Sequence, residues 1–179
     1  TYTGWNVRHP DIGGPGQTLA LLGSTIPFPA TRAERQASGD PRPSIEERYA
    51  SKEDYLRQVQ HAAEALVQQG YLLAIATGKA RRGLDRVLDD TGMRHLFASS
   101  RCADEAFSKP HPQMLEDILD QTGVDAGRAL MVGDTVYDME MARSAKVAGL
   151  AVSYGVHARE RLLDCGALAC LDSFPEVCA

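Results

Sequence analysis

The chain has 179 residues, of which 44% are hydrophobic and 24% are charged, and its formal net charge is −5. This composition provides for a hydrophobic core and excludes a largely disordered chain. The negative net charge and the lack of a basic tract argue against a nucleic-acid partner, because such binding depends on clustered Lys and Arg. No apolar run approaches the roughly 20 residues of a membrane helix, so we also expect no membrane partner.

Residues 1–50 differ from the rest of the chain because they hold six of the nine prolines. Proline-rich composition without a clear period predicts a small, irregular and partly helical segment. From residue 51 the sequence becomes regular, and we expect a core domain over residues 51–179. Ser51 can cap the first helix of this domain, with Asp54 completing the S-x-x-D pattern, and Gly70 ends it.

Strands and helices alternate through the predicted core domain. Residues 71–76 (YLLAIA) form a continuous apolar run, as a strand buried on both faces requires. Further strands are predicted at 96–99, 129–132 (ALMV), 150–154 and 169–171, and helices at 82–88, 110–121, 136–144 and 158–163. This alternation predicts an α/β fold with a parallel, Rossmann-like sheet and helices on both faces. Ligands of such sheets bind beyond the carboxyl ends of the strands.

The first polar cluster at such a strand end is Thr77-Gly78-Lys79, directly after residues 71–76. A hydroxyl there, together with the backbone N–H groups of the following turn, can hold a phosphate oxygen. Taken alone, a Thr-Gly pair after a strand is more often a helix cap and turn.

The second cluster is Ser108-Lys109-Pro110-His111-Pro112. Its prolines fix the backbone around Lys109, whose ammonium can then neutralise phosphate charge. The alternative is a solvated surface lysine. We interpret His111 as a structural residue that forms a hydrogen bond at the start of the next helix.

The third cluster is Gly133-Asp134-Thr135-Val136-Tyr137-Asp138, directly after residues 129–132. Asp134 ends the strand and Asp138 lies one helical turn later, so the two carboxylates can converge on a hard cation such as Mg²⁺. The alternative is a helix N-cap at Asp134 and a surface carboxylate at Asp138.

The three strings ATGK, SKPHP and GDTVYDMEMA resemble motifs II, III and IV of the haloacid dehalogenase superfamily, and within it phosphoglycolate phosphatase-like members. The similarity extends to VSYGVHARERLL near the end and covers roughly residues 51–174. The resemblance implies a cytoplasmic Mg²⁺-dependent phosphatase that acts on a small phosphorylated metabolite through an aspartyl-phosphate. It also implies that residues 1–50 are part of a cap domain.

The resemblance also implies roles for individual residues. Thr77 and Gly78 hold the phosphoryl group, and Lys109 offsets its charge and orients the nucleophile. Asp134 ligates Mg²⁺, and Asp138 supports the metal site directly or through water.

The sequence departs from the family in motif I, an apolar strand followed by Asp-x-Asp-Gly-Thr that carries the nucleophile. No such string occurs in the chain, and the nearest match, Asp11-Ile12-Gly13-Gly14, lacks the second aspartate and the apolar strand before it. The chain begins at Thr1 and not at methionine, so one hypothesis places motif I upstream of Thr1. The alternative is a protein whose first strand has been lost or replaced, and such a protein binds phosphate without turnover.

Motif I also supplies a central strand in the family, between the strands of motifs II and IV. Without it, residues 71–76 and 129–132 must pair directly or be bridged by another segment. Residues 2–7 are too polar for a good bridge. A partner chain can serve instead, so we keep a homo-oligomer as an open alternative.

The cysteines Cys102, Cys165, Cys170 and Cys178 show neither a C-x-x-C pair nor the spacing of a zinc site. Cys165 and Cys170 can in principle pair. We favour four reduced thiols, as is typical of a cytoplasmic protein.

Overall fold

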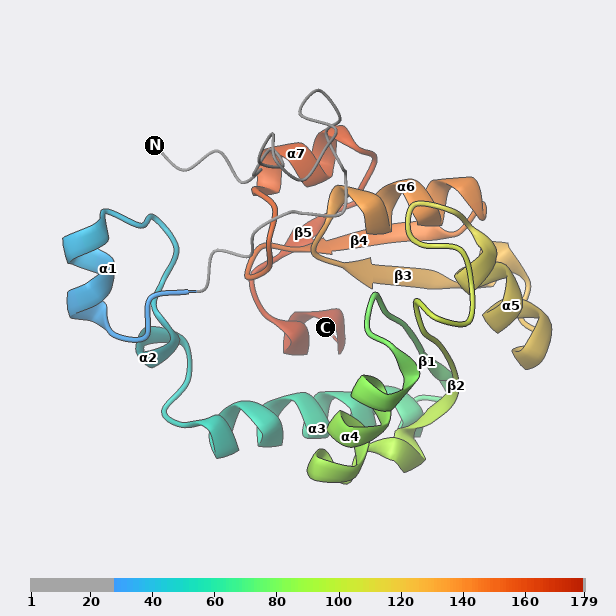
Figure 1. Cartoon of the computed structure of the whole chain (residues 1–179), viewed down its shortest axis with the longest axis horizontal. Helices are drawn as coiled ribbons and strands as arrows, with labels where there is room; N and C mark the ends of the chain where they lie inside the picture. The colour runs from blue at the N-terminus through green and yellow to red at the C-terminus, as the bar shows by residue number, and fades with distance from the viewer. Residues whose placement is uncertain (1–27, 179) are drawn as a thin grey trace, which may run out of the picture. The chain divides into compact units, whose positions relative to one another are not determined.

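The computed structural model describes residues 28–178 of the chain (Figure 1). The chain divides into two units, residues 1–48 and residues 49–179. Asp11 and residues 2–7 lie outside the described residues, so their predicted roles stay predictions.

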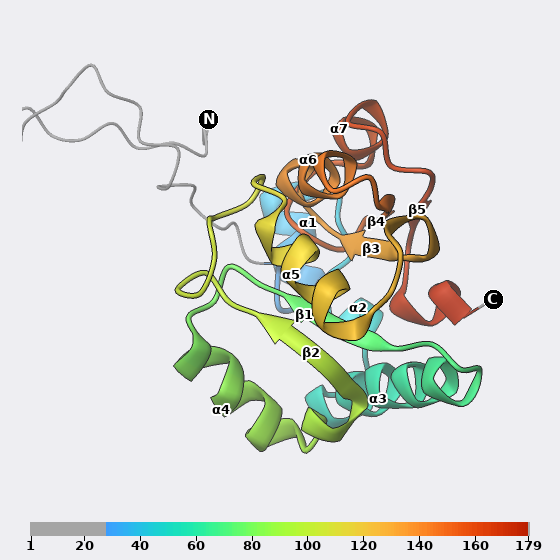
Figure 2. The same ribbon diagram turned by 90° about the vertical axis from the view of Figure 1, so that its right-hand side faces the viewer.

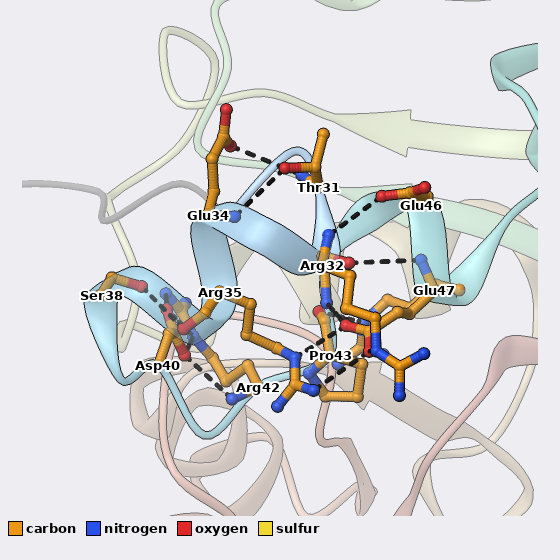
Figure 3. Close-up of polar contacts among 12 residues, drawn as sticks. Thr31, Arg32, Glu34, Arg35, Ser38, Asp40, Arg42, Pro43, Glu46 and Glu47 are labelled. Carbon is orange, nitrogen blue, oxygen red and sulfur yellow. Dashed lines mark hydrogen bonds and ion pairs between the residues drawn. The ribbon is translucent and has the colours of Figure 1, made fainter.

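The first unit contains two short helices, α1 (Arg32–Ser38) and α2 (Ile45–Arg48), joined by charged side chains (Figure 3). The Thr31 hydroxyl accepts a hydrogen bond from the Glu34 N–H and so begins α1 with a capping box. Arg35 Nε donates to Glu47 Oε2 at 2.8 Å, which joins α1 to α2. The buried Ser44 hydroxyl donates to the same oxygen at 2.8 Å. Residues 28–48 are partly helical, as the composition predicts, and the role of residues 1–50 as part of a cap domain stays a prediction.

The second unit alternates helices and strands along the chain (Figure 1). Its elements are α3 (Lys52–Gln68), β1 (Leu73–Ala76), α4 (Arg81–Thr91), η2 (Arg94–Leu96), β2 (Phe97–Arg101), α5 (Gln113–Thr122), η3 (Ala126–Arg128), β3 (Leu130–Gly133), α6 (Val136–Ser144), β4 (Ala148–Val152), α7 (Arg159–Asp164), β5 (Cys170–Leu171) and η4 (Phe174–Cys178). Every strand and helix predicted for residues 51–179 therefore occurs, and all strand pairs are parallel.

The start of α3 follows the predicted capping pattern. The Ser51 hydroxyl accepts a hydrogen bond from the Asp54 N–H at 3.1 Å, and the Asp54 side chain accepts from the Ala50 N–H at 3.3 Å. Ala62, Ala63 and Leu66 then form its buried face.

The start of α5 differs from the prediction, because the helix begins at Gln113 and not at Pro110. His111 precedes Pro112, and a residue before proline is disfavoured in helical conformation. The Lys109–Pro110 peptide bond is cis. The predicted role of His111 is confirmed, since its Nδ1 accepts from the Gln113 N–H at 3.2 Å.

The strands form two sheets and not one (Figure 2). β1 pairs with β2, and a second sheet has the order β3-β4-β5. β1 and β3 do not pair with each other, and no other described strand joins them. Direct pairing, one of the two expected consequences of a missing central strand, is therefore absent.

The open edges explain a difference in burial. We predict that residues 71–76 and 129–132 are buried on both faces, yet Ala74 is exposed and Leu130 is 50% exposed. Each strand lacks a neighbour on one side, so its side chains are less covered than those of an internal strand.

One core cluster spans both sheets. Met114 and Leu115 of α5 pack with Met141 and Ala142 of α6, and side chains of β1 and β3 (Ala76 and Met131) pack against this cluster. The sheet of β1 and β2 has helices on both faces: α3 and α4 cover one face, and α5 lies on the opposite face (Figure 2). Helices therefore lie on both faces, as predicted.

Among residues 28–178, no helix is both long and apolar enough to cross a membrane. Cys102, Cys165 and Cys170 are free thiols, so Cys165 and Cys170 do not form the disulfide that their spacing permits.

Candidate active site

Thr77 and Gly78 form an open turn at the carboxyl end of β1. The Thr77 N–H donates to the carbonyl oxygen of Arg101 at 3.0 Å and so continues the pairing with β2. The Thr77 hydroxyl accepts from the Lys79 N–H at 3.2 Å, which leaves its own proton available to an incoming acceptor. A Cβ at Gly78 would meet nothing within 4 Å, so a ligand oxygen can approach this backbone closely.

Lys109 lies between the ends of the two sheets. Its Nζ donates to the carbonyl oxygen of Ala76, the last residue of β1, at 3.0 Å. It also donates to Asp138 Oδ1 on α6 at 2.6 Å. Only 19% of the Lys109 side chain is exposed, so it is not the solvated surface lysine of the alternative interpretation.

Asp138 is a buried carboxylate with both oxygens engaged. Oδ1 accepts from Lys109, while Oδ2 accepts from the Thr135 N–H at 3.0 Å and from the Thr135 hydroxyl at 2.7 Å. Gly133 permits this arrangement, because a Cβ there would lie 2.4 Å from the Asp138 Cβ. The helix N-cap of α6 is Thr135 and not Asp134, and Asp138 is 3% exposed. The alternative of a capping Asp134 and a surface Asp138 is therefore wrong.

Asp134 is held by the loop that follows β4. Its Oδ2 accepts from the Val156 N–H at 2.9 Å, and its carbonyl oxygen accepts from the His157 N–H at 3.2 Å. Within the part of the chain that the structure describes, nothing donates a hydrogen bond to its Oδ1. One carboxylate oxygen is therefore fixed by the protein and the other is available to a ligand.

The loop of residues 154–157 has no role in our sequence-based interpretation. A Cβ at Gly155 would lie 2.0 Å from the Asp134 Cβ, so glycine is required for this close approach. The His157 Nδ1 accepts from the Val136 N–H at 2.9 Å, and burial lowers the pKa of the imidazole. The string VSYGVHARERLL contains these residues, but a hydrogen bond to a segment about 20 positions away leaves no local pattern in a sequence.

The donor set is compatible with Mg²⁺ and too small for a closed metal cage. No group of three or more His, Cys, Asp or Glu residues suited to a metal occurs among residues 28–178. Mg²⁺ takes only one or two protein carboxylates and completes its shell with water and phosphate oxygens. The free oxygen of Asp134 fits that requirement, whereas the oxygens of Asp138 are occupied by Lys109 and Thr135.

The sequence match now identifies the class of protein. Residues 37–152, more than half of the chain, match the family described as haloacid dehalogenase-like hydrolase. The chain belongs to this family.

Curated relatives are named phosphatases. A probable phosphatase IndB from Dickeya dadantii is 36% identical over 110 residues, which cover 61% of the chain and 48% of that protein. A phosphoglycolate phosphatase from Aliivibrio fischeri is 36% identical over 107 residues, which cover 59% of the chain and 47% of that protein. The chain therefore spans about half the length of the curated relatives that it matches.

Solved structures share the fold. A predicted phosphoglycolate phosphatase from Haemophilus somnus superposes with a TM-score of 0.63 at 28% identity and covers 67% of the chain and 54% of that structure. A putative beta-phosphoglucomutase from Thermotoga maritima superposes with a TM-score of 0.62 at 21% identity and covers 81% of the chain and 72% of that structure. The second match shows the fold alone.

Proposed function

We propose that these residues belong to a Mg²⁺-dependent phosphatase that hydrolyses a small phosphomonoester of the phosphoglycolate kind. One observation carries the proposal: Lys109 bridges the carboxyl end of β1 and the acidic start of α6, at 3.0 Å and 2.6 Å. The ammonium thus joins the end of β1, which carries a hydroxyl, to the end of β3, which carries a carboxylate with a free oxygen. The carboxyl ends of strands are the usual ligand position in α/β folds. The names of the relatives supply the substrate class.

The geometry supports a distinct role for each residue. The Thr77 hydroxyl and the Gly78 N–H donate to the non-bridging oxygens of the phosphoryl group. Lys109 adds positive charge beside them, and its orientation is fixed by Asp138. Asp134 offers its free oxygen to the cation, and Mg²⁺ bound there would offset phosphate charge. Asp138 then supports the site through Lys109 and Thr135.

The nucleophile is the part of the site that the described residues do not include. Asp134 and Asp138 are the carboxylates that follow the carboxyl end of β3, and both have other roles in the proposal. Among residues 28–178, no strand occupies the position beside the free edges of β1 and β3. A strand in that position, parallel to both, would carry an aspartate at its carboxyl end into the reach of Lys109.

The proposal is tested by hydrolysis of p-nitrophenyl phosphate with Mg²⁺. We expect Asp134→Asn to lower kcat by about 100-fold or more, as loss of a preorganised electrostatic group does. Glu140→Gln, which removes the same charge on the following helix α6, leaves the rate unchanged. Hydrolysis that is equally fast in Asp134→Asn and in the unsubstituted protein would contradict the proposal, whereas an unsubstituted protein without hydrolysis would favour the second candidate below.

A second candidate is a protein that binds phosphate or a phosphorylated metabolite without turnover. The absence of an Asp-x-Asp-Gly-Thr string from the chain favours it. Calorimetry distinguishes the two, since this candidate requires Mg²⁺-dependent binding of phosphate by a protein that shows no hydrolysis.

A third candidate is an assembly role, in which a partner chain, including a second copy, completes the sheet. The open edges of β1 and β3 favour it. Light scattering at several concentrations tests it, and a monomer throughout would count against it.

A further inference from the structure

Three consecutive residues after β4 contact the segment that carries Asp134. Gly155 lies against the Asp134 side chain so closely that a Cβ would come within 2.0 Å of its Cβ. The Val156 N–H donates to Asp134 Oδ2 at 2.9 Å, and the His157 N–H donates to the Asp134 carbonyl oxygen at 3.2 Å. The loop therefore holds both the main chain and the side chain of one residue.

The His157 side chain adds a contact to the start of α6. Its Nδ1 accepts from the N–H of Val136, the first residue of the helix, at 2.9 Å. The first N–H groups of a helix have no partner within the helix, and side chains or water usually satisfy them. The Thr135 hydroxyl already accepts from the Asp138 N–H, so His157 satisfies a different donor of the same turn.

This bond defines the protonation of the ring. An Nδ1 that accepts a hydrogen bond carries no proton, so the imidazole is neutral with its proton on Nε2. The ring also packs against Tyr137 of α6, with the ring centroids 6.0 Å apart. His157 thus links the loop to the helix that carries Asp138.

Apolar packing does not explain how the loop is held. The Val156 side chain is 54% exposed, and Gly155 has no side chain. The loop is therefore fixed largely by its hydrogen bonds, and these bonds converge on Asp134 and on the N–H of Val136.

We propose that residues 155–157 form a positioning clamp for Asp134, in which His157 is a positioning residue. The clamp holds Oδ2 on the Val156 N–H and thereby leaves Oδ1 as the oxygen that would bind a cation. This inference rests on the proposed role of Asp134 as a metal ligand. Substitution of a residue that orients a metal ligand typically lowers the metal affinity by about 10- to 100-fold.

Two substitutions of His157 separate positioning from packing. In His157→Asn, the amide oxygen takes the place of Nδ1 and can still accept from the Val136 N–H. In His157→Phe, the ring that packs on Tyr137 remains and the acceptor is lost. We expect Mg²⁺ to bind about tenfold more weakly to the Phe variant, by calorimetry, and within about threefold of the unsubstituted protein for the Asn variant.

Amide hydrogen exchange gives a readout that does not depend on the metal. Exchange of the Val136 and Val156 N–H groups should be faster in the Phe variant and unchanged in the Asn variant. If the unsubstituted protein binds no Mg²⁺, the proposed metal site fails, while these exchange rates still decide whether the clamp exists. Equal exchange and equal affinity in all three proteins would overturn the clamp.

A measurement on the unsubstituted protein covers the case in which the Phe variant does not fold. Nitrogen-15 NMR of the imidazole at pH 7.5 should show a neutral ring with its proton on Nε2. A proton on Nδ1, in either a neutral or a charged ring, is incompatible with the bond to Val136 and would overturn the proposal.

Discussion

The carboxyl ends of β1 and β3 carry the two halves of the site and differ in how they are built. At the end of β1, a Cβ on Gly78 would meet nothing within 4 Å, and no described residue accepts from the Thr77 hydroxyl or the Gly78 N–H. At the end of β3, Asp134 and Asp138 are fixed by hydrogen bonds and by glycines with no room for a Cβ. The acidic half is therefore preorganised, and the half that we propose to bind phosphate is left open for a ligand.

Lys109 is the side chain that joins the two halves. Its contacts to Ala76 and to Asp138 connect the end of β1 to the helix after β3, two strands that share no neighbour within residues 28–178. Removal of this lysine should therefore affect stability and not only ligand binding.

The largest effect is expected for Lys109→Met, which leaves Asp138 as a buried carboxylate without its cation. We expect a loss of about 3 kcal/mol in the free energy of unfolding, measured by urea denaturation, since breaking a buried ion pair is costly. Lys79→Met, at the exposed end of β1, is the control and should change stability by less than about 0.5 kcal/mol. A loss below about 1 kcal/mol for Lys109→Met would show that the two halves are independent.

Alanine at the glycines of the two halves gives a second contrast. Gly133→Ala forces a Cβ to within 2.4 Å of the Asp138 Cβ, and we expect about 2 kcal/mol of destabilisation from this overpacking. Gly78→Ala meets nothing within 4 Å and should be nearly neutral for stability. Thermal unfolding of the two variants tests the difference, and equal losses would mean that the end of β1 is as tightly built as the end of β3.

Thr77 and Thr135 should show the same contrast in stability as the two glycines. Thr135→Ala removes the N-cap of α6 and a donor to Asp138, with an expected loss of about 1 kcal/mol in unfolding free energy. Thr77→Ala should change stability little and should weaken phosphate binding. Urea denaturation measures the two changes in stability, and phosphate titration measures the change in affinity. The prediction fails if Thr77→Ala leaves the phosphate affinity unchanged.

The smallest expected effect is a pH dependence of stability that arises from Glu105, beside the sheet of β1 and β2. Hydrogen bonds from Arg81 and from the Cys102 N–H lower the pKa of Glu105 from 4.5 to about 2. A depressed carboxyl pKa contributes stability that is complete above pH 4.5 and is lost as the pH falls toward 2. Glu105→Gln should therefore differ from the unsubstituted protein in urea midpoint at pH 6 and differ less at pH 3. A difference that stays constant with pH would exclude this ion pair as its source.

Sequence patterns predicted the helices and strands of residues 51–179 well. The helix expected at residues 136–144 is α6 with the same bounds, because Thr135 and Asp138 form a capping box. The contact between Lys109 and Asp138 follows the rule that strand carboxyl ends meet at one edge.

Features that depend on distant contacts were not predictable in the same way. β1 and β3 do not pair with each other. Local periodicity predicts strands but does not encode their order in a sheet. The bond from His157 to Val136 joins segments about 20 positions apart. The burial of residues 129–132 was overestimated because an apolar run indicates what a strand can bury and not whether a neighbour is present.

Calorimetric titration of inorganic phosphate with and without Mg²⁺ is the most direct test of the proposed site, because it requires no nucleophile. We expect phosphate to bind and Mg²⁺ to strengthen its binding. Asp134→Asn should remove the effect of Mg²⁺, and Thr77→Ala should weaken the binding of phosphate itself. Phosphate that does not bind, or binding that neither Mg²⁺ nor these substitutions change, would contradict the proposed site.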